Sequence, residues 1–250
     1  MPGEGTRIKP IAFIDAEINP ESEKVLDIGC VKTDGSVFHS GSLAEFTRFI
    51  RGSAFLCGHN ILNHDLKYLQ NAVRDAGLTE NDAIDTLYLS PLLFPAKPYH
   101  ALVKDDKLQT DDINNPLNDS IKAKDLFYDE VSAFRQKDDV LKRIFYHLLK
   151  DMPEFTAFFR FLDFGETHHA DICNLVRSRF FGRICEHANI GEMTAKHPVE
   201  LAYCLALIDV QDRYSITPPW VLKNYPVIEK LMYLLRNKPC QAGCAYCSNA

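Results

Sequence analysis

The first half of the chain alternates short apolar runs with turn residues, which is the pattern of a β-sheet. Apolar runs at residues 11–18, 25–32 and 36–39 predict three strands, and a hairpin turn signal at residues 33–35 joins the last two. Residues 54–57 and 83–87 predict two more strands, and helical spacing predicts helices at residues 43–50, 62–73 and 119–134. The expected fold class is α/β, with a mixed sheet that is antiparallel at one edge and flanked by helices.

From about residue 141 the pattern changes to helices alone. Apolar positions at the helical period predict helices near residues 140–149, 155–164, 172–181, 199–210 and 227–235. Pro218 and Pro219 break the chain before the last of them. We therefore expect an α/β domain at residues 8–137, a smaller all-helical domain at residues 138–236, and a cysteine-bearing tail or linker at residues 237–250.

Composition and charge limit the class of protein. The chain has 250 residues, of which 46% are hydrophobic and 25% charged, as in an ordinary water-soluble globular protein. It has no apolar stretch long enough for a membrane helix and no secretory signal at its beginning, so a cytoplasmic protein with no membrane partner is expected. The net charge of −6 argues against a protein that coats long duplex DNA. An enzyme that binds only a few terminal nucleotides remains compatible.

Acidic residues at informative spacings carry the candidate chemistry. Asp15 and Glu17 lie two residues apart in a predicted strand, so their carboxylates project from the same face. Burying unpaired carboxylates costs free energy, so such a pair usually holds a cation or lies at a cleft. Asp65 is expected in the first turns of the helix that follows the strand at residues 54–57, beyond the strand ends where open α/β sheets bind ligands. A D-x-E pair on its own is equally compatible with the polar face of a half-buried strand.

Four segments in this order resemble the motifs of the DnaQ-like (DEDD) 3′→5′ exonuclease superfamily: F-I-D-A-E-I, G-H-N-I-L-N-H-D-L-K-Y-L, A-I-D-T-L and N-P-L-N-D-S. The resemblance covers about residues 10–135 and implies an RNase H-like sheet. It makes Asp15, Glu17, Asp65 and Asp119 the acids that bind two Mg²⁺ or Mn²⁺ ions, which clamp the entering and leaving oxygens of an in-line displacement. Asp85, in the third segment, lies outside that quartet and is expected to be structural.

One position departs from the family's pattern. The histidine branch has its general base five residues before the last Asp, where this chain has Asn114, and the tyrosine branch would have Tyr at the position of Asn115. An amide cannot accept a proton from water at neutral pH. Three explanations stay open: His100 is the base, the metal ions alone activate water for a slow reaction, or the domain is degenerate and binds nucleic acid ends without cutting them. His64 is expected at the rim of the cleft, and His59 in a hydrogen-bonded turn.

The carboxyl-terminal tail contains Cys240, Cys244 and Cys247 in a C-x3-C-x2-C arrangement, which lets three thiolates face one ion. Eight cysteines in a chain without a secretory signal favour thiols or a metal over disulfides. Zinc and an iron–sulfur cluster both suit this spacing, and so does the radical-SAM motif, although that family has a barrel after it. A fourth ligand is expected from Cys185, His187, solvent or residues beyond this chain. Three free thiols are the alternative.

These features together predict a metal-dependent 3′→5′ exonuclease that hydrolyses single-stranded DNA ends to nucleoside 5′-monophosphates, with RNA as the less favoured substrate. The order of a nuclease module and a cysteine-bearing connector also resembles, more weakly, bacterial proteins in which such a module precedes a RecQ-like helicase. That resemblance implies a helicase region in the same polypeptide. Two other interpretations are a non-catalytic module that binds nucleic acid ends or proteins, and a metal-dependent enzyme centred on the cysteine tail.

Overall fold

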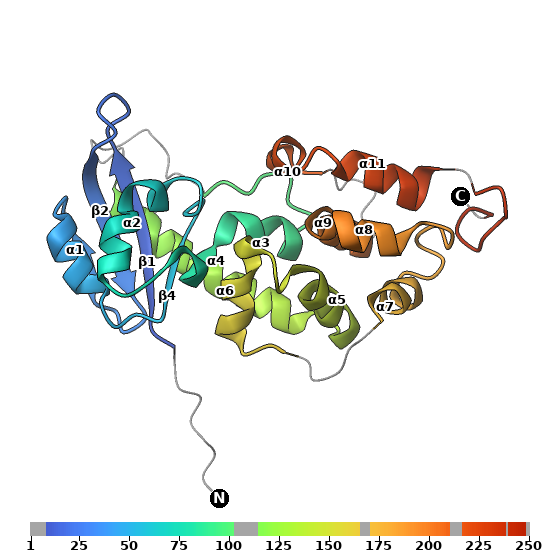
Figure 1. Ribbon diagram of the computed structural model, residues 1–250, viewed down its shortest axis with the longest axis horizontal. Helices are drawn as coiled ribbons and strands as arrows, with labels where there is room; N and C mark the ends of the chain where they lie inside the picture. Colours follow the sequence, from blue (N-terminus) through green and yellow to red (C-terminus); the bar gives the residue numbers. More distant parts are fainter. Residues whose placement is uncertain (1–8, 103–114, 166–170, 211–216, 239, 249–250) are drawn as a thin grey trace, which may run out of the picture. The chain divides into compact units, whose positions relative to one another are not determined.

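The computed structural model describes residues 9–102, 115–165, 171–210, 217–238 and 240–248 (Figure 1). By their contacts, the residues group into two compact units. The first comprises residues 1–87 and 102–129, and the second comprises residues 88–101 and 130–250. Helix α4 (Pro116–Gln136) contributes to both units, so the chain passes from one to the other without a linker at that point.

A five-stranded mixed sheet forms the first unit, with the strand order β3-β2-β1-β4-β5. Strands β1 (Ile11–Ile18), β2 (Val25–Lys32) and β3 (Val37–His39) form the antiparallel part of the sheet, in which β2 pairs with both β1 and β3. Strands β4 (Phe55–Gly58) and β5 (Ala83–Asp85) continue the sheet in parallel with β1. The α/β class, the mixed sheet and its antiparallel edge agree with the expectation from the sequence.

Alternating residues of β1 face two different helical layers. Ala12, Ile14 and Ala16 belong to a core shared with buried residues of α1 (Leu43–Ile50) and α2 (Asp65–Asp75). Phe13 points to the opposite face, where its ring contacts Phe127 of α4 with 5.7 Å between ring centroids. Residues at odd positions of β1 therefore face the side of the sheet on which α4 packs.

A glycine allows α4 to approach that face closely. Gly29 of β2 lies opposite Asp15 of β1 in the sheet register. A Cβ added to Gly29 would lie 2.0 Å from the backbone nitrogen of Leu117 and 2.1 Å from the carbonyl carbon of Pro116. The first turn of α4 thus lies directly on the strand next to Asp15, which no larger residue would permit.

Two of the differences from the expected element boundaries concern the segments that carry Asp119 and Asp85. The helix expected to open at Asp119 begins at Pro116, because proline suits the first helical turn and the side-chain oxygen of Asn115 accepts the N–H of Leu117 at 3.0 Å. The strand expected at residues 83–87 ends at Asp85, and helix α3 (Thr86–Leu93) begins at once. There the Asp85 carboxylate accepts the N–H of Leu87 at 2.9 Å and starts the helix.

Helices make up the regular structure of the second unit in its described residues. The five expected helices are present as α5 (Asp139–Leu149), α6 (Pro153–Leu162), α7 (Ile172–Arg179), α9 (Pro198–Asp209) and α11 (Ile228–Met232), the last continued by a π-helical turn at Tyr233–Asn237. Two further helices, α8 (Ile190–Lys196) and α10 (Pro219–Asn224), were not expected. Pro219 begins α10, so the prolines expected to break the chain instead start a short helix.

Aromatic side chains form much of the core of this second unit. Phe155, Phe158 and Tyr203 are almost completely buried, and the Tyr203 hydroxyl donates to the carbonyl oxygen of Tyr88 at 2.9 Å. Phe134 contacts Phe158 edge to face, with 5.6 Å between ring centroids. Within the part of the chain that the structure describes, the search for a helix long and apolar enough to cross a membrane finds none.

Candidate functional site

The predicted acid pair lies in the second half of β1. The last register pair between β1 and β4 is Phe13 with Cys57, so Asp15 and Glu17 lie beyond the paired part, on the face that α4 covers. The pKa of Asp15 is raised to about 8, first by burial and then by the negative charges of Asp65, Asp119 and Glu17, in that order of strength. The fold therefore brings the four predicted acids close enough for one of them to be held mostly protonated at neutral pH.

Asp65 is held rigidly at the start of α2. Its side chain is 1% exposed, and its Oδ1 accepts the N–H of Ala16 at 2.8 Å. This bond ties α2 to β1 past the point where β4 has ended. A Cβ on Gly58, the last residue of β4, would lie 2.8 Å from the carbonyl oxygen of Ile14, so glycine is needed where the chain leaves the sheet. Burial raises the pKa of Asp65, although the nearby His64 ring and the N–H of Ala16 oppose the shift.

Asp119 comes from the first turn of α4, two residues after the backbone atoms that lie on Gly29. Its Oδ1 lies 3.3 Å from the Nζ atom of Lys122, one turn further along the helix. Its charge also acts on Asp15. Three separate elements, β1, α2 and α4, thus contribute the four acids.

Asp85 has the structural position that was expected for it. It is fully buried and accepts the N–H groups of Asn60, Leu62 and Leu87 at 2.8, 3.1 and 2.9 Å. Burial raises its pKa to about 7, against the effect of these three donors. Asn60 has a positive φ of 65°, a conformation that Asn tolerates better than most residues. Asp85 therefore fixes the loop that carries the chain from β4 to Asp65.

Histidines near the motifs have different environments. The His64 ring lies against the quartet, with its Nδ1 3.8 Å from Asp65 Oδ1, and the neighbouring carboxylates raise its pKa, Asp65 most strongly. The Nδ1 atom of His59 lies 2.9 Å from the Thr86 hydroxyl, as expected for a hydrogen-bonded turn residue. No chemical role was expected for His64, although its position next to Asp65 in the sequence was a signal for one.

His100 and the two asparagines were the candidates at or near the base position. His100 belongs to the second unit, where it is buried and its Nδ1 lies 2.8 Å from the Ser90 hydroxyl. Burial lowers its pKa to about 4. Asn115 accepts the N–H groups of Leu117 and Asn118 and so caps α4. Asn114 lies outside the described residues.

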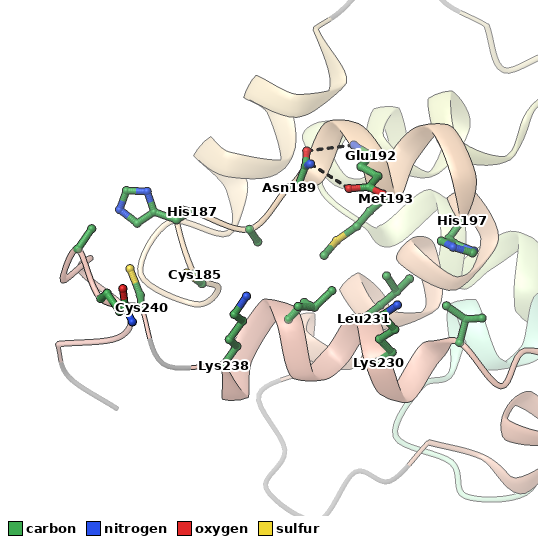
Figure 2. A pocket seen from close by; sticks show the side chains of 15 residues that line it. Cys185, His187, Asn189, Glu192, Met193, His197, Lys230, Leu231, Lys238 and Cys240 are labelled. Carbon is green, nitrogen blue, oxygen red and sulfur yellow. Dashed lines mark hydrogen bonds between the residues drawn. The ribbon is translucent and has the colours of Figure 1, made fainter.

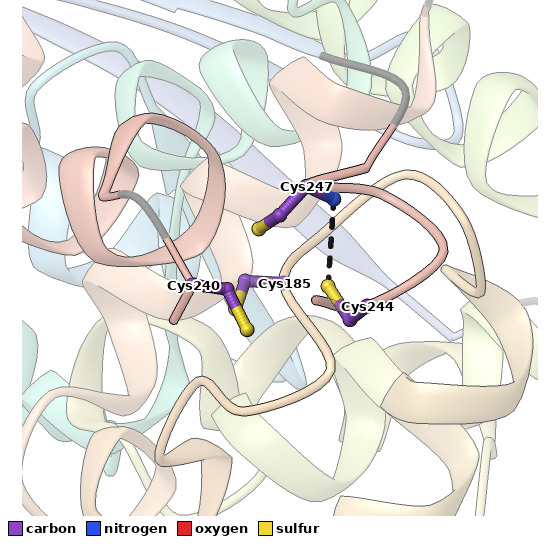
Figure 3. A group of neighbouring side chains, drawn as sticks. All are labelled: Cys185, Cys240, Cys244 and Cys247. Carbon is purple, nitrogen blue, oxygen red and sulfur yellow. Dashed lines mark hydrogen bonds between the residues drawn. The ribbon is translucent and has the colours of Figure 1, made fainter. Parts of the chain in front are cut away.

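A second candidate site is formed by four cysteines of the second unit (Figure 3). The Sγ atoms of Cys185, Cys240, Cys244 and Cys247 all lie within 4.8 Å of one another, so together they can hold a metal ion. Among the described residues, no other group of three or more His, Cys, Asp or Glu side chains has its potential ligand atoms this close together. The structure thus adds Cys185, one of the expected fourth ligands, to the predicted triad.

Hydrogen bonds order the two cysteine-bearing segments, and one of them joins the segments to each other. The N–H of Ala245 donates to Glu186 Oε1 at 2.9 Å, and the N–H of Cys247 donates to Cys244 Sγ at 3.4 Å. The N–H of Cys247 contributes most to lowering the pKa of Cys244 to about 6. Arg177 binds the carbonyl oxygens of Glu186 and Ala188 and so fixes the loop that carries Cys185. The site is therefore ordered by hydrogen bonds as well as by its thiols.

Comparisons of the chain with protein-family models, with curated proteins and with solved structures find no match. The function therefore has to be inferred from the residues of the two candidate sites. One is a quartet of carboxylates in the α/β unit, and the other is a cluster of four thiols in the helical unit.

Proposed function

We propose that this protein is a metal-dependent 3′→5′ exonuclease that hydrolyses single-stranded DNA ends to nucleoside 5′-monophosphates. The observation that carries the proposal is the convergence of three other carboxylates on Asp15, whose pKa burial and like charges raise to about 8. A protein that gathers acids at such a cost in free energy usually uses them for cations or chemistry. RNA is the less favoured substrate, and a helicase region in the same polypeptide is the proposed partner.

Two divalent cations fit this donor set. The acids provide hard oxygen ligands, which favour Mg²⁺ or Mn²⁺ over zinc, and their mutual repulsion would be relieved by positive charge. When bound, the pair of ions would supply Lewis-acid stabilisation of the attacking water and the leaving 3′ oxygen. Asp15, Glu17 and Asp119 would hold the ions, Asp65 would help to hold the second, and Glu17 would also orient the water.

The second candidate function is a module that binds nucleic acid ends without cutting them. It is favoured by Asn114 and Asn115 at the positions where the related nucleases have a base. The side-chain oxygen of Asn115 accepts two backbone N–H groups of α4, so this side chain caps the helix instead of acting as a base. Activity in this chain would then depend on metal-activated water or on another imidazole, and slow turnover is expected.

We also propose that the four cysteines bind one structural zinc ion. A Zn–S distance of about 2.3 Å places tetrahedral ligands about 3.8 Å apart, and the Sγ atoms here already lie within 4.8 Å of one another. An iron–sulfur cluster would stand between the thiolates and hold them further apart, so the compact arrangement favours a single ion. Four protein thiolates close the coordination sphere, which is typical of structural rather than catalytic zinc.

Cleavage of a 5′-labelled single-stranded oligonucleotide tests the nuclease proposal. The wild-type protein with Mn²⁺ should give a ladder of shortened products, which disappears when Mn²⁺ is omitted. Replacing a partner of a metal ligand typically costs about 10–100-fold, so Asp15→Ala, which removes a ligand itself, should cost more than about 100-fold. Asp75→Ala is the matched control, because Asp75 is exposed at the other end of α2 from Asp65.

Equal cleavage by the wild type and Asp15→Ala would contradict the proposal. Binding of the oligonucleotide with no cleavage in any metal would favour the second candidate function instead. Running the same assay with an RNA oligonucleotide compares the two substrates directly.

A further inference from the structure

A cavity of about 680 Å³ lies in the helical unit beside the cysteine cluster (Figure 2). Its walls come from α8, from α11 and its π-helical continuation, and from the loop at residues 240–242, with Cys185 and Cys240 at one end. Cavities of about 300–1,000 Å³ are typical of sites that bind small molecules or single groups of larger ones. Neither of the proposed functions uses this cavity.

The lining combines an apolar floor with cationic side chains. Met193 of α8 and Leu231 of α11 are buried and face the cavity, whereas Lys230 and Lys238 are exposed at its edge. A ligand that fits both features has a flat or apolar part and carries negative charge. A nucleotide has this chemistry, with a base for the floor and a phosphate for a lysine.

The two lysines at the edge of the cavity are not neutralised by the acid of its lining. Glu192, the acid of the lining, accepts hydrogen bonds from Lys196 at 2.9 Å and from Asn189 at 3.0 Å, so a lysine outside the lining already offsets its charge. Among the described residues, the Lys238 ammonium group has no hydrogen bond or ion pair. Lys230 also lowers the pKa of Glu192 through its charge, but less than Lys196 does. Both lysines are therefore available to an anion.

The proposed metal centre changes this balance at one end. Zinc with four thiolates keeps a formal charge of −2, so the end of the cavity formed by Cys185 and Cys240 would repel phosphate. Lys238, two residues before Cys240, offsets part of that charge. We therefore expect Lys230, on α11 and away from the cysteines, to contribute more to anion binding than Lys238 does (Figure 2).

We propose that this cavity binds single-stranded nucleic acid, with one base in the cavity and the backbone phosphates along the two lysines. Lys230 lies in α11, and Lys238 follows the π-helical turn eight residues later. A strand offers several phosphates in succession, so it can place a separate phosphate at each lysine. The choice of nucleic acid as the ligand rests on the proposed exonuclease function, but the binding itself needs neither Mg²⁺ nor Mn²⁺.

Fluorescence anisotropy of a labelled oligothymidylate of about 10 nucleotides, a length in the range that one binding module covers, tests the proposal. The titration uses the full chain without Mg²⁺ or Mn²⁺, so that no cleavage occurs. Each lysine–phosphate contact to a single strand adds about −0.7 to the slope of log K against log salt, so the wild-type slope should include about −1.4 from the two lysines. Lys230→Ala should weaken binding several-fold and make the slope less steep by about 0.7, and Lys230→Arg should keep it.

Lys223→Ala is the matched control, because Lys223 is exposed on α10 and does not line the cavity. It should bind like the wild type. Thymidine 5′-monophosphate should bind much more weakly than the oligonucleotide, since it offers one phosphate where the strand offers several. Duplex of the same sequence should also bind weakly, because its bases are stacked and paired.

Unchanged affinity and salt slope in the double variant Lys230→Ala/Lys238→Ala would overturn the inference. So would equal affinity for duplex and single strand. The outcome is separable from that of the nuclease proposal: Asp15→Ala should lose cleavage and keep this lysine-dependent binding. Cleavage by the wild type without lysine-dependent binding would leave the nuclease proposal standing and remove only this one.

Discussion

The carboxylate quartet and the cysteine cluster each bring together four potential ligands, yet the two sites differ in how tightly they gather them. The Sγ atoms lie within 4.8 Å of one another, whereas the carboxylates interact through their charges and raise the pKa of Asp15 to about 8. Among these thiols the pKa of Cys244 is lowered to about 6, but burial raises the pKa of Cys185 and of Cys247, so the cluster carries little repelling charge before any ion binds. Carboxylates are charged and repel one another, so their close assembly needs a cation or a proton.

The two sites also differ in what holds their backbones. Three of the cysteines lie in one short loop, at residues 240–247, and a hydrogen bond from Ala245 to Glu186 joins that loop to the segment with Cys185. The carboxylates come from three elements that approach one another only because Gly29 and Gly58 lack side chains. The cysteine site is therefore mainly a local structure, and the acid site depends on the packing of the whole α/β unit.

The largest predicted effect is the loss of zinc from the cysteine site with no change at the acid site. Wild-type protein purified without chelator should contain about one zinc ion per chain, and Cys244→Ser should lose it, because structural zinc contributes about 10–16 kcal/mol of binding free energy. Elemental analysis measures the metal, and hydrogen exchange should show faster exchange at residues 240–248. Cleavage should be unchanged, because the acids belong to the other unit.

Cys173→Ser is the control for this experiment, because Cys173 is a free cysteine outside the cluster. Protein that contains iron instead of zinc would favour a cluster. Protein with neither metal would leave four ordinary thiols.

The next effect concerns the base that the acid site lacks. If Asn114 is the reason for slow turnover, Asn114→His should speed cleavage by about 10²–10⁴-fold, the usual contribution of a general base. Asn114→Gln should give no gain, and the wild type should prefer Mn²⁺ over Mg²⁺. Asn114→His could instead be no faster than the wild type while His100→Ala folds but is inactive. That result would identify His100 as the base.

Close backbone approach at the acid site predicts a smaller effect on both stability and activity. Gly29→Ala places a Cβ 2.0 Å from the Leu117 nitrogen, so α4 must move and carry Asp119 with it. Overpacking of this kind typically costs about 1–3 kcal/mol, measured by urea unfolding, and cleavage should fall as well. Gly191→Ala in α8 is the control, because its nearest neighbour would be 3.7 Å away and its helix should gain about 0.5–1 kcal/mol. Normal activity in Gly29→Ala would show that Asp119 does not need this register.

The last prediction is that the two sites respond to pH in opposite directions. The folded-state pKa of Asp15 is about 8 against 3.8 in the unfolded chain, so the metal-free folded protein binds an extra proton between about pH 4 and pH 8. Its free energy of unfolding should therefore fall as the pH rises through that window. Asp15→Asn should reduce this slope without abolishing it, because the pKa of Asp85 is also raised. The cysteine site should bind zinc more tightly as the pH rises, because its thiols must lose protons.

Thermal unfolding of the metal-free protein across this pH range measures the first trend, and zinc titration at each pH measures the second. Saturating Mn²⁺ should flatten the stability slope of the wild type if the ions bind the quartet. If the free energy of unfolding of the metal-free protein rises between pH 4 and pH 8, the pKa of Asp15 is not raised in the folded protein.

The sequence by itself determined the local parts of both sites. A two-residue spacing within an apolar run was enough to predict that Asp15 and Glu17 share one face of β1, and strand and helix signals placed Asp65 at the start of α2. The C-x3-C-x2-C spacing likewise identified three of the four cysteines. Short helices such as α8 and α10 were missed because so few residues show no clear period.

Only the tertiary structure decided which distant residues join these local patterns. Cys185 lies 55 residues before Cys240, and no spacing rule could select it over His187 as the neighbour of the triad. The need for glycine at position 29 likewise became visible only when α4 was seen on the sheet. Sequence spacing fixes the directions of side chains within one strand, helix or loop, because the backbone geometry there is regular. Contacts between elements depend on how their surfaces pack, and that is set by the whole core.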